Sequence, residues 1–192
     1  MGGLPDNART AFDNSPHLKV VYWPFVRANG EAGIQSRVFL RNGATAIALD
    51  VKTHEVYVVR QTRETPEGSI TTIELPGGGV DSGDTPLDTA RKELLEEAGV
   101  VALNEQDWVP LYREDGVHPI DGLAFTSQHA FLLLAGRKVQ DPSGEENTEV
   151  TTVPLSELIA MDNRNEFNDP LGPYAMRRAQ DWLREHRPDL LT

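Results

Sequence analysis

The segment from residue 76 to residue 100 constrains the fold of this chain more than any other part of the sequence. Its first nine residues, PGGGVDSGD, are rich in glycine and directly follow a strand-like run over residues 70–75. Helix signals come next, because Thr85 suits the N-cap and Pro86 suits the first helical position. The pattern therefore predicts a strand, a glycine loop and a helix over residues 86–98 in direct succession.

The predicted helix has two distinct faces. At about 100° per residue, an apolar stripe forms from Leu87, Ala90, Leu94 and Ala98. A second, acidic stripe lies about 120° away and consists of Glu93, Glu96 and Glu97. Carboxylates at this spacing repel one another near the negative end of a helix, whereas a divalent cation would reverse that because it binds converging carboxylate oxygens. The spacing alone is also typical of a solvated acidic face, but the glycine loop before the helix favours a site because it lets the backbone approach a ligand.

Residues 78–100, GGVDSGDTPLDTARKELLEEAGV, resemble the Nudix box, which is usually written G-x5-E-x7-R-E-U-x-E-E-x-G-U with U apolar. The positions that match in register are Gly78, Glu93, Leu94, Glu96, Glu97, Gly99 and Val100. Asp84 stands where the pattern has Glu, and Lys92 stands where it has Arg. Lysine supplies one point charge in place of a planar guanidinium. These departures predict a lower rate or an altered metal geometry rather than loss of catalysis.

Shorter segments resemble the ADP-sugar pyrophosphatases of this family. They are Arg60-Gln61-Thr62-Arg63, Glu74-Leu75-Pro76-Gly77-Gly78, and the acidic run from Glu145 to Val150. Residues 18–40 also resemble the strand pair that precedes the core in that subgroup, where it often builds a dimer. The loop after the box reads HPIDG over residues 118–122, where the subgroup usually has Ser-Pro-Gly.

The resemblance implies metal-dependent hydrolysis of the pyrophosphate linkage of a nucleoside diphosphate derivative, with ADP-ribose or another nucleotide sugar preferred. It implies Mg²⁺ as the cofactor, with Mn²⁺ as a substitute. Glu93 and Glu97 are the expected ligands, Glu96 is a further ligand or an orienting partner, and the Gly77 carbonyl adds an oxygen. An anionic substrate of this kind needs charge neutralisation and positioning more than covalent chemistry.

The resemblance also implies roles for groups outside the acidic stripe. A general base must lie within hydrogen-bond reach of the attacking water, and in the subgroup it often comes from the late acidic loop. Glu146 is the first candidate, followed by Glu145 and Glu149. Lys92 and Glu96 complete the expected catalytic set. The expected substrate-binding residues are Arg60, Arg63, Glu74 and Gly78.

The remaining patterns predict an α+β chain. Strands are expected at 18–26, 34–40, 44–50, 55–61, 70–75, 108–112, 129–135 and 149–153, and further helices at 155–161 and 173–186. A mixed sheet with flanking helices packs such a list naturally, and the resemblance implies a Nudix-type α/β/α sandwich with an N-terminal β-hairpin extension. We expect a flexible tail over residues 1–17 and a single domain over residues 18–192.

Composition and charge limit the partners. The chain has 30 acidic residues against 18 Lys and Arg, and its formal net charge of −12 disfavours general nucleic-acid binding. No run approaches the roughly 18 apolar residues of a membrane span, and cysteine is absent. We therefore expect a cytoplasmic protein that binds a small anionic nucleotide and neither nucleic acid nor membrane. The resemblance implies a homodimer.

Three alternatives stay open at this point. One is a nucleoside triphosphate pyrophosphohydrolase, including one that removes oxidised nucleotides, although residues 18–40 disfavour it. Another is a Nudix-fold sensor that binds a nucleotide sugar without cleaving it, which Asp84 and Lys92 favour and the full set of glutamates disfavours. The third is an acidic interaction protein with a chance motif.

Overall fold

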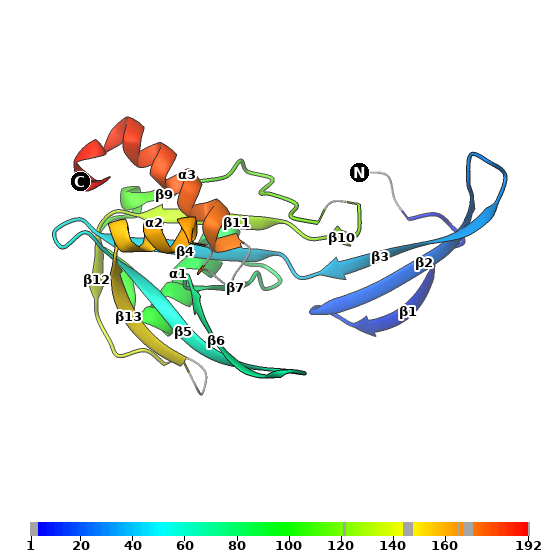
Figure 1. Ribbon diagram of the computed structural model, residues 1–192, viewed down its shortest axis with the longest axis horizontal. Coiled ribbons are helices and arrows are strands. Elements are labelled where there is room, and N and C mark those ends of the chain that lie inside the picture. Colours follow the sequence, from blue (N-terminus) through cyan, green and yellow to red (C-terminus); the bar gives the residue numbers. More distant parts are fainter. Residues whose placement is uncertain (1–3, 121, 144–147, 165, 167–170, 192) are drawn as a thin grey trace. The chain divides into compact units, whose positions relative to one another are not determined.

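The computed structural model describes residues 4–120, 122–143, 148–164, 166 and 171–191 (Figure 1). The chain packs as two compact units. The first comprises Met1–Asn42 and His118–Gln128, and the second comprises Gly43–Val117 and His129–Thr192. The single domain that we expect over residues 18–192 stays a prediction.

The second unit is built on a sheet in which, among the described residues, the strands run in the order β13-β5-β4-β11-β9. Two further strands extend it, since β6 pairs with β5 and β7 pairs with β4. The strands are β4 (Gly43–Asp50), β5 (Glu55–Thr65), β6 (Gly68–Glu74), β7 (Gly77–Gly79), β9 (Trp108–Pro110), β11 (Gln128–Leu133) and β13 (Thr148–Pro154). The strands predicted from the sequence in this unit are all present, with ends that differ by a few residues.

Three helices cover the two faces of this sheet within the described part of the chain. They are α1 (Pro86–Ala98), α2 (Leu155–Asn163) and α3 (Leu171–His186). Figure 1 shows α2 and α3 on one side of the sheet and α1 on the other. The expected α+β class and the α/β/α layering are confirmed.

The alternating side chains of strand β4 pack against helices on both faces of the sheet. Its alternate residues Ala44, Ala46 and Ala48 pack with Ala90 and Leu94 of α1. The intervening residues Ile47 and Leu49 pack instead with the apolar faces of α2 and α3. Because successive side chains of a strand point to opposite faces, β4 contributes to two cores. Its alanines leave room for the α1 backbone to lie close to the sheet.

Helix α1 begins and ends at the residues that the sequence predicts. The Thr85 hydroxyl accepts a hydrogen bond from the Asp88 backbone N–H at 3.1 Å, and the Asp88 carboxylate accepts one from the Thr85 N–H at 3.3 Å. This reciprocal capping box satisfies two N–H groups that the first turn leaves unpaired. At the other end, Gly99 has a φ of +69° and closes the helix in the left-handed conformation.

Several short elements were not predicted from the sequence. Strands β8 (Val100–Ala102) and β12 (Gly136–Lys138) form a separate antiparallel pair after α1. Two 3-10 turns, η1 (Glu105–Asp107) and η2 (Pro188–Leu191), complete the second unit. Elements of three or four residues show too little periodicity to be recognised in a single sequence.

The first unit contains a sheet with the order β1-β2-β3-β10. Its strands are β1 (Arg9–Asn14), β2 (Leu18–Val26), β3 (Ala32–Leu40) and β10 (Ala124–Phe125). The predicted hairpin is present, and β2 and β3 meet at a turn where Gly30 has a φ of +85°. The sheet is mixed, because β10 runs parallel to β3 while the other pairs are antiparallel.

The flexible tail expected over residues 1–17 requires correction at Arg9–Asn14. These residues form β1, which pairs antiparallel with Leu18–Tyr22 of β2. All six side chains of β1 are exposed, so the sequence carries no buried face that would mark a strand. The backbone hydrogen bonds to β2 hold it in place.

No helix in the part of the chain that the structure describes is both long enough and apolar enough to span a bilayer.

Candidate active site

The acidic stripe of α1 lies against strand β7. The carboxylate Oε2 of Glu97 accepts a hydrogen bond from the backbone N–H of Gly77 at 2.9 Å. The Glu97 side chain is half-buried at this contact. This hydrogen bond holds the last turn of α1 against β7, the strand at the start of the glycine loop. It also orients the Glu97 carboxylate toward the β7 backbone.

Glu93 meets the same strand one turn earlier on the helix. Its carboxylate lies so close to Gly78 that a Cβ on that residue would overlap it. Gly78 pairs with Ala44 of β4, whose side chain packs toward α1. A side chain at this position would have to displace the half-buried Glu93 carboxylate from β7, which glycine avoids.

The third glutamate of the stripe, Glu96, and Lys92 one turn before it point toward solvent. Glu96 and Lys92 are exposed, and the Glu96 carbonyl accepts a hydrogen bond from the Ser143 N–H at 2.8 Å. Lys92 Nζ lies 3.4 Å from Asp81 Oδ2. The hydrogen bond and charge of Asp81, together with Glu96 and Glu93, raise the pKa of Lys92 above its usual value. Lys92 thus links α1 to the glycine loop.

The donor set near β7 suits a hard cation. Two carboxylates, from Glu93 and Glu97, converge on Gly77 and Gly78, and oxygen ligands of this kind are those that Mg²⁺ and Mn²⁺ prefer. Among the described residues, no three His, Asp or Glu side chains are already arranged to hold a metal ion. The two glutamates fit such an ion chemically, with further oxygens to come from other ligands.

A second polar group lies on β5 and β6. Arg63 donates two hydrogen bonds to the Glu74 carboxylate, from Nε at 2.9 Å and from Nη2 at 2.8 Å. The Thr72 hydroxyl also donates to Glu74, at 2.6 Å. These bonds, led by that of Arg63, lower the pKa of Glu74 below its usual value despite partial burial. Glu74 is therefore a firmly ionised, oriented carboxylate.

Strand register places Arg63 and Arg60 on opposite faces of the sheet. In β5, Val59 pairs with Val150 and with Glu74, and Val150 packs in the core beneath α1. Arg63 lies an even number of residues from Val59 and so shares the face of α1. Arg60 pairs with Ile73, which packs in the core under α2 and α3. The predicted substrate residues Arg63 and Glu74 are thus on the α1 side, and Arg60 is not.

The candidate bases come from the segment that enters β13. Glu145 and Glu146 lie outside the described residues. Glu149 is exposed and pairs with Arg60, so it points to the face of α2 and α3. Glu149 therefore does not share the α1 face with Glu93 and Glu97.

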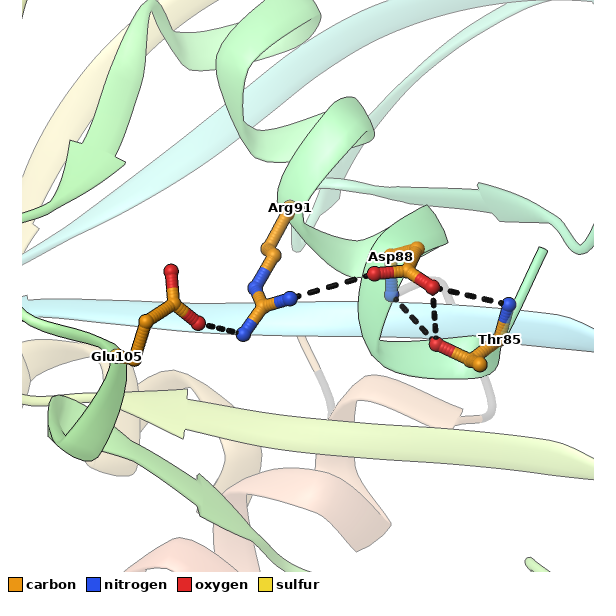
Figure 2. A network of polar contacts seen from close by, with 4 residues as sticks. All are labelled: Thr85, Asp88, Arg91 and Glu105. Carbon is orange, nitrogen blue, oxygen red and sulfur yellow. Dashed lines mark hydrogen bonds and ion pairs between the residues drawn. The ribbon is translucent and has the colours of Figure 1, made fainter.

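The start of α1 is held by a network of polar contacts (Figure 2). The Arg91 guanidinium contacts Asp88 through Nη1 at 3.3 Å and contacts Glu105 of η1 through Nη2. The Thr85 hydroxyl, followed by its backbone N–H and Arg91, lowers the pKa of Asp88. The network connects the first half of α1 to η1.

Two residues of the candidate site were not predicted from the sequence. Asp81 was not identified as the partner of Lys92, although an acid inside a glycine loop is a detectable signal. Thr72 was not identified as a donor to Glu74, although the two are separated by an even number of residues on one predicted strand and so share a face.

The chain resembles known proteins over most of its length. The model of the NUDIX domain matches residues 40–174. An ADP-ribose pyrophosphatase of Bacillus subtilis (strain 168) is 26% identical over 152 residues, which are 79% of each chain. An 8-oxo-dGTP diphosphatase of Haemophilus influenzae (strain ATCC 51907 / DSM 11121 / KW20 / Rd) is 35% identical over 77 residues, which are 40% of this chain and 51% of that protein.

A solved structure of an ADP compounds hydrolase superposes with a TM-score of 0.72 over 94% of both chains, at 16% identity. This likeness confirms the fold. Because the domain model covers more than half of the chain, the protein belongs to the NUDIX family.

Proposed function

We propose that this Nudix pyrophosphatase hydrolyses the pyrophosphate linkage of a nucleoside diphosphate derivative, with ADP-ribose or another nucleotide sugar preferred. The observation that carries the proposal is the convergence of Glu93 and Glu97 on the glycines of β7. A merely solvated acidic face would not require half-buried carboxylates against a strand that has no side chains. The extent of similarity to the Bacillus subtilis ADP-ribose pyrophosphatase supports the substrate class.

In this proposal Glu93 and Glu97 hold Mg²⁺, which Mn²⁺ can replace. Glu96 serves as a further ligand or an orienting partner, and the Gly77 carbonyl contributes an oxygen. A bound divalent ion neutralises phosphate charge and lowers the pKa of a coordinated water. Gly78 keeps the approach to the carboxylates open, and Lys92 holds the glycine loop through Asp81.

Arg63 and Glu74 bind the substrate in this proposal. They lie on the α1 side of the sheet, and Thr72 and Arg63 fix the Glu74 carboxylate as an acceptor for a hydroxyl or amino group. Arg60 points to the other face, so we expect it to contribute less to substrate binding than Arg63. The general base is assigned to Glu146, with Glu145 as the alternative, on the resemblance of the late acidic run to the subgroup.

We also propose that the protein is a homodimer formed through the first unit. Four apolar residues share one face of its sheet, since Phe12 pairs with Val20, Ile34 with Pro24 and Leu40 with Leu18, while Val26 lies two residues beyond Pro24. Val26 and Ile34 are 72% and 70% exposed. Exposed apolar side chains that share one face of a sheet support an interaction surface there.

The local similarity to the Haemophilus influenzae 8-oxo-dGTP diphosphatase supports one second candidate, a nucleoside triphosphate pyrophosphohydrolase. The deciding experiment is a hydrolysis panel with the full-length protein, in Mg²⁺, in Mn²⁺ and with a chelator. It contains ADP-ribose, GDP-mannose, NADH, dGTP and 8-oxo-dGTP, with the products identified by mass.

The proposal expects metal-dependent cleavage of a linked diphosphate into two monophosphate products. Preferential release of pyrophosphate from dGTP or 8-oxo-dGTP would replace it with the second candidate. If nothing is cleaved while ADP-ribose still binds, the protein is a sensor and the proposal is wrong.

A further inference from the structure

Lys92 lies on α1 close to several carboxylates of the same helix. At about 100° per residue, Glu96 at i+4 and Asp88 at i−4 each lie within about 40° of Lys92 around the helix axis. Opposite charges at this spacing attract one another on a helix surface. Asp88 already accepts a hydrogen bond from the Thr85 hydroxyl and is paired with Arg91 (Figure 2). Glu96 is therefore the partner on α1 that Lys92 would be expected to take.

The structure pairs Lys92 with a carboxylate of the glycine loop instead. Its Nζ lies 3.4 Å from Asp81 Oδ2, and this is its one ion pair among the described residues. The Glu96 carboxylate is exposed and has no hydrogen-bond or ion-pair partner within the part of the chain that the structure describes. The ammonium is thus held on the loop, and the carboxylate one turn ahead of it on the helix is left free.

Asp84 does not take this part, although it stands at the acidic position of the Nudix box. Its side chain is exposed and makes no polar contact with the described residues, whereas its backbone N–H donates a hydrogen bond to the Asp81 carbonyl at 3.2 Å. Of the two acids in this turn, it is the first, Asp81, that holds Lys92.

The position of the ammonium matters for a divalent ion on the acidic stripe. Lysine is protonated at neutral pH, so Lys92 paired with Glu96 would neutralise one carboxylate of the stripe. An ammonium and a divalent ion compete for the same carboxylate oxygens, and two cations at neighbouring positions repel each other. Pairing with Asp81 removes this competition while Lys92 stays on the helix.

We propose that Asp81 is a positioning residue for the metal site, an inference that rests on the proposed function. By pairing with Lys92, Asp81 keeps the ammonium away from Glu96 and leaves that carboxylate free for the divalent ion. Asp81 thereby raises the affinity of the acidic stripe for the ion without being a ligand. The competing explanation is a tether, in which the pair only ties the glycine loop to α1.

The test is a Mn²⁺ titration of the full-length protein and its variants at one ionic strength, with free Mn²⁺ measured by electron paramagnetic resonance. The site on the stripe is the binding that is lost in Glu97→Gln. Asp81→Asn should weaken binding there by about threefold or more, since the released ammonium moves onto the stripe, whereas Asp81→Glu keeps the pair and should stay within about twofold of the wild type. Lys92→Gln should bind Mn²⁺ at least as tightly as the wild type, because it removes the competing charge.

The double variant Asp81→Asn/Lys92→Gln separates the possible mechanisms. It should bind Mn²⁺ as Lys92→Gln does, because no ammonium remains to be released. An equal loss from Asp81→Asn in both backgrounds would show that Asp81 acts on the ion directly, and would overturn the inference. Weaker binding in Lys92→Gln is the result expected of a tether and would also overturn it.

Two further outcomes distinguish this inference from the proposed function. Wild-type affinity in Asp81→Asn, or failure of Asp81→Glu to preserve binding, would overturn the role of Asp81 and leave the metal site in place. Mn²⁺ binding that does not depend on Glu97 would overturn the metal assignment itself, and the inference with it. Circular dichroism of each variant checks that the fold is retained, as expected for substitutions at Asp81 and Lys92, whose side chains are 52% and 48% exposed.

Discussion

Strands β3 and β4 follow each other in the chain, yet they bury their side chains to very different extents. Nearly every residue of β4 is buried, and its alternate side chains enter two separate cores, one under α1 and one under α2 and α3. In β3 no residue is fully buried, and apolar side chains such as Ile34 remain exposed.

The two sheets differ in the surface that covers their apolar side chains. The sheet of the second unit has helices of its own unit on both faces, and the side chains of β4 and most apolar side chains of β5 and β11 are buried against them. The sheet of the first unit keeps an apolar face exposed, and burial of that face requires another surface. We therefore propose that the second unit carries the chemistry and that self-association occurs through the first.

The largest expected effect is on turnover and concerns the second unit. Glu97→Gln retains an oxygen that can accept the hydrogen bond from Gly77 N–H but removes the negative charge. We expect turnover to fall by about 10²- to 10³-fold, because a metal ion held by this charge supplies several kcal/mol of stabilisation to the transition state. Initial rates at saturating Mg²⁺ measure the effect.

The matched control is Glu185→Gln, which removes an exposed glutamate from α3 of the same unit. Its rate should equal that of the wild type, and both variants should have the unfolding midpoint of the wild type. A Glu97→Gln enzyme with undiminished turnover would show that the acidic stripe does not hold the catalytic metal.

The second prediction compares the truncation of one apolar side chain to alanine in each of the two units. Leu94 is completely buried in the core beneath α1, and Ile34 is 70% exposed. Leu94→Ala should lower the free energy of unfolding by about 3 kcal/mol, whereas Ile34→Ala in the monomer should change it by less than about 0.5 kcal/mol. Urea denaturation at low protein concentration measures both. Similar losses in the two variants would remove the contrast between the units.

Features that depend on local signals could be predicted from the sequence. Helix α1 was placed to the residue because Thr85 and Gly99 mark its ends and because its apolar stripe has a helical period. The hairpin of β2 and β3 was found because Asn29-Gly30 specifies a tight turn. The acidic stripe followed from the spacing of its glutamates.

Features that depend on pairing between distant segments of the chain could not be predicted from the sequence. Strand β7 consists of three glycines and is defined only by its hydrogen bonds to β4, and β1 is an exposed strand defined only by β2. The bond between Glu97 and Gly77 N–H joins residues that are 20 positions apart. Arg60 and Arg63 were treated as one group, although their odd separation on a strand already places them on opposite faces.

The third prediction tests the exposed face of the first unit. Ile34→Asp puts a charge on the apolar face, and we expect the dissociation constant of the homodimer to rise by about tenfold or more, since a buried unpaired charge is costly at an interface. Sedimentation equilibrium measures this change. Gln35→Asp is the control, because the neighbouring residue carries its side chain on the other face of β3. A monomeric wild type, or equal weakening in both variants, would contradict the assigned interface.

The smallest expected effect concerns the ion pair of Arg63 and Glu74, and it depends on pH. The folded-state pKa of Glu74 is below its unfolded value, so the stabilisation is present above the unfolded pKa and is lost as the pH falls through the folded pKa. A double-mutant cycle of Arg63→Gln and Glu74→Gln should give a coupling energy of about 1 kcal/mol near pH 7, as expected for a partly buried bidentate pair. The coupling should shrink toward zero as Glu74 becomes protonated.

Urea denaturation of the four proteins of the cycle, between about pH 7 and about pH 3, measures this dependence. Thr72→Val is a useful further variant, because it removes the second donor to Glu74 and should move the loss of coupling to higher pH. A coupling energy near zero at pH 7 would show that Arg63 does not hold Glu74 as a carboxylate. Arg63 would then be available to bind the substrate directly, and the two residues would need separate roles in the site.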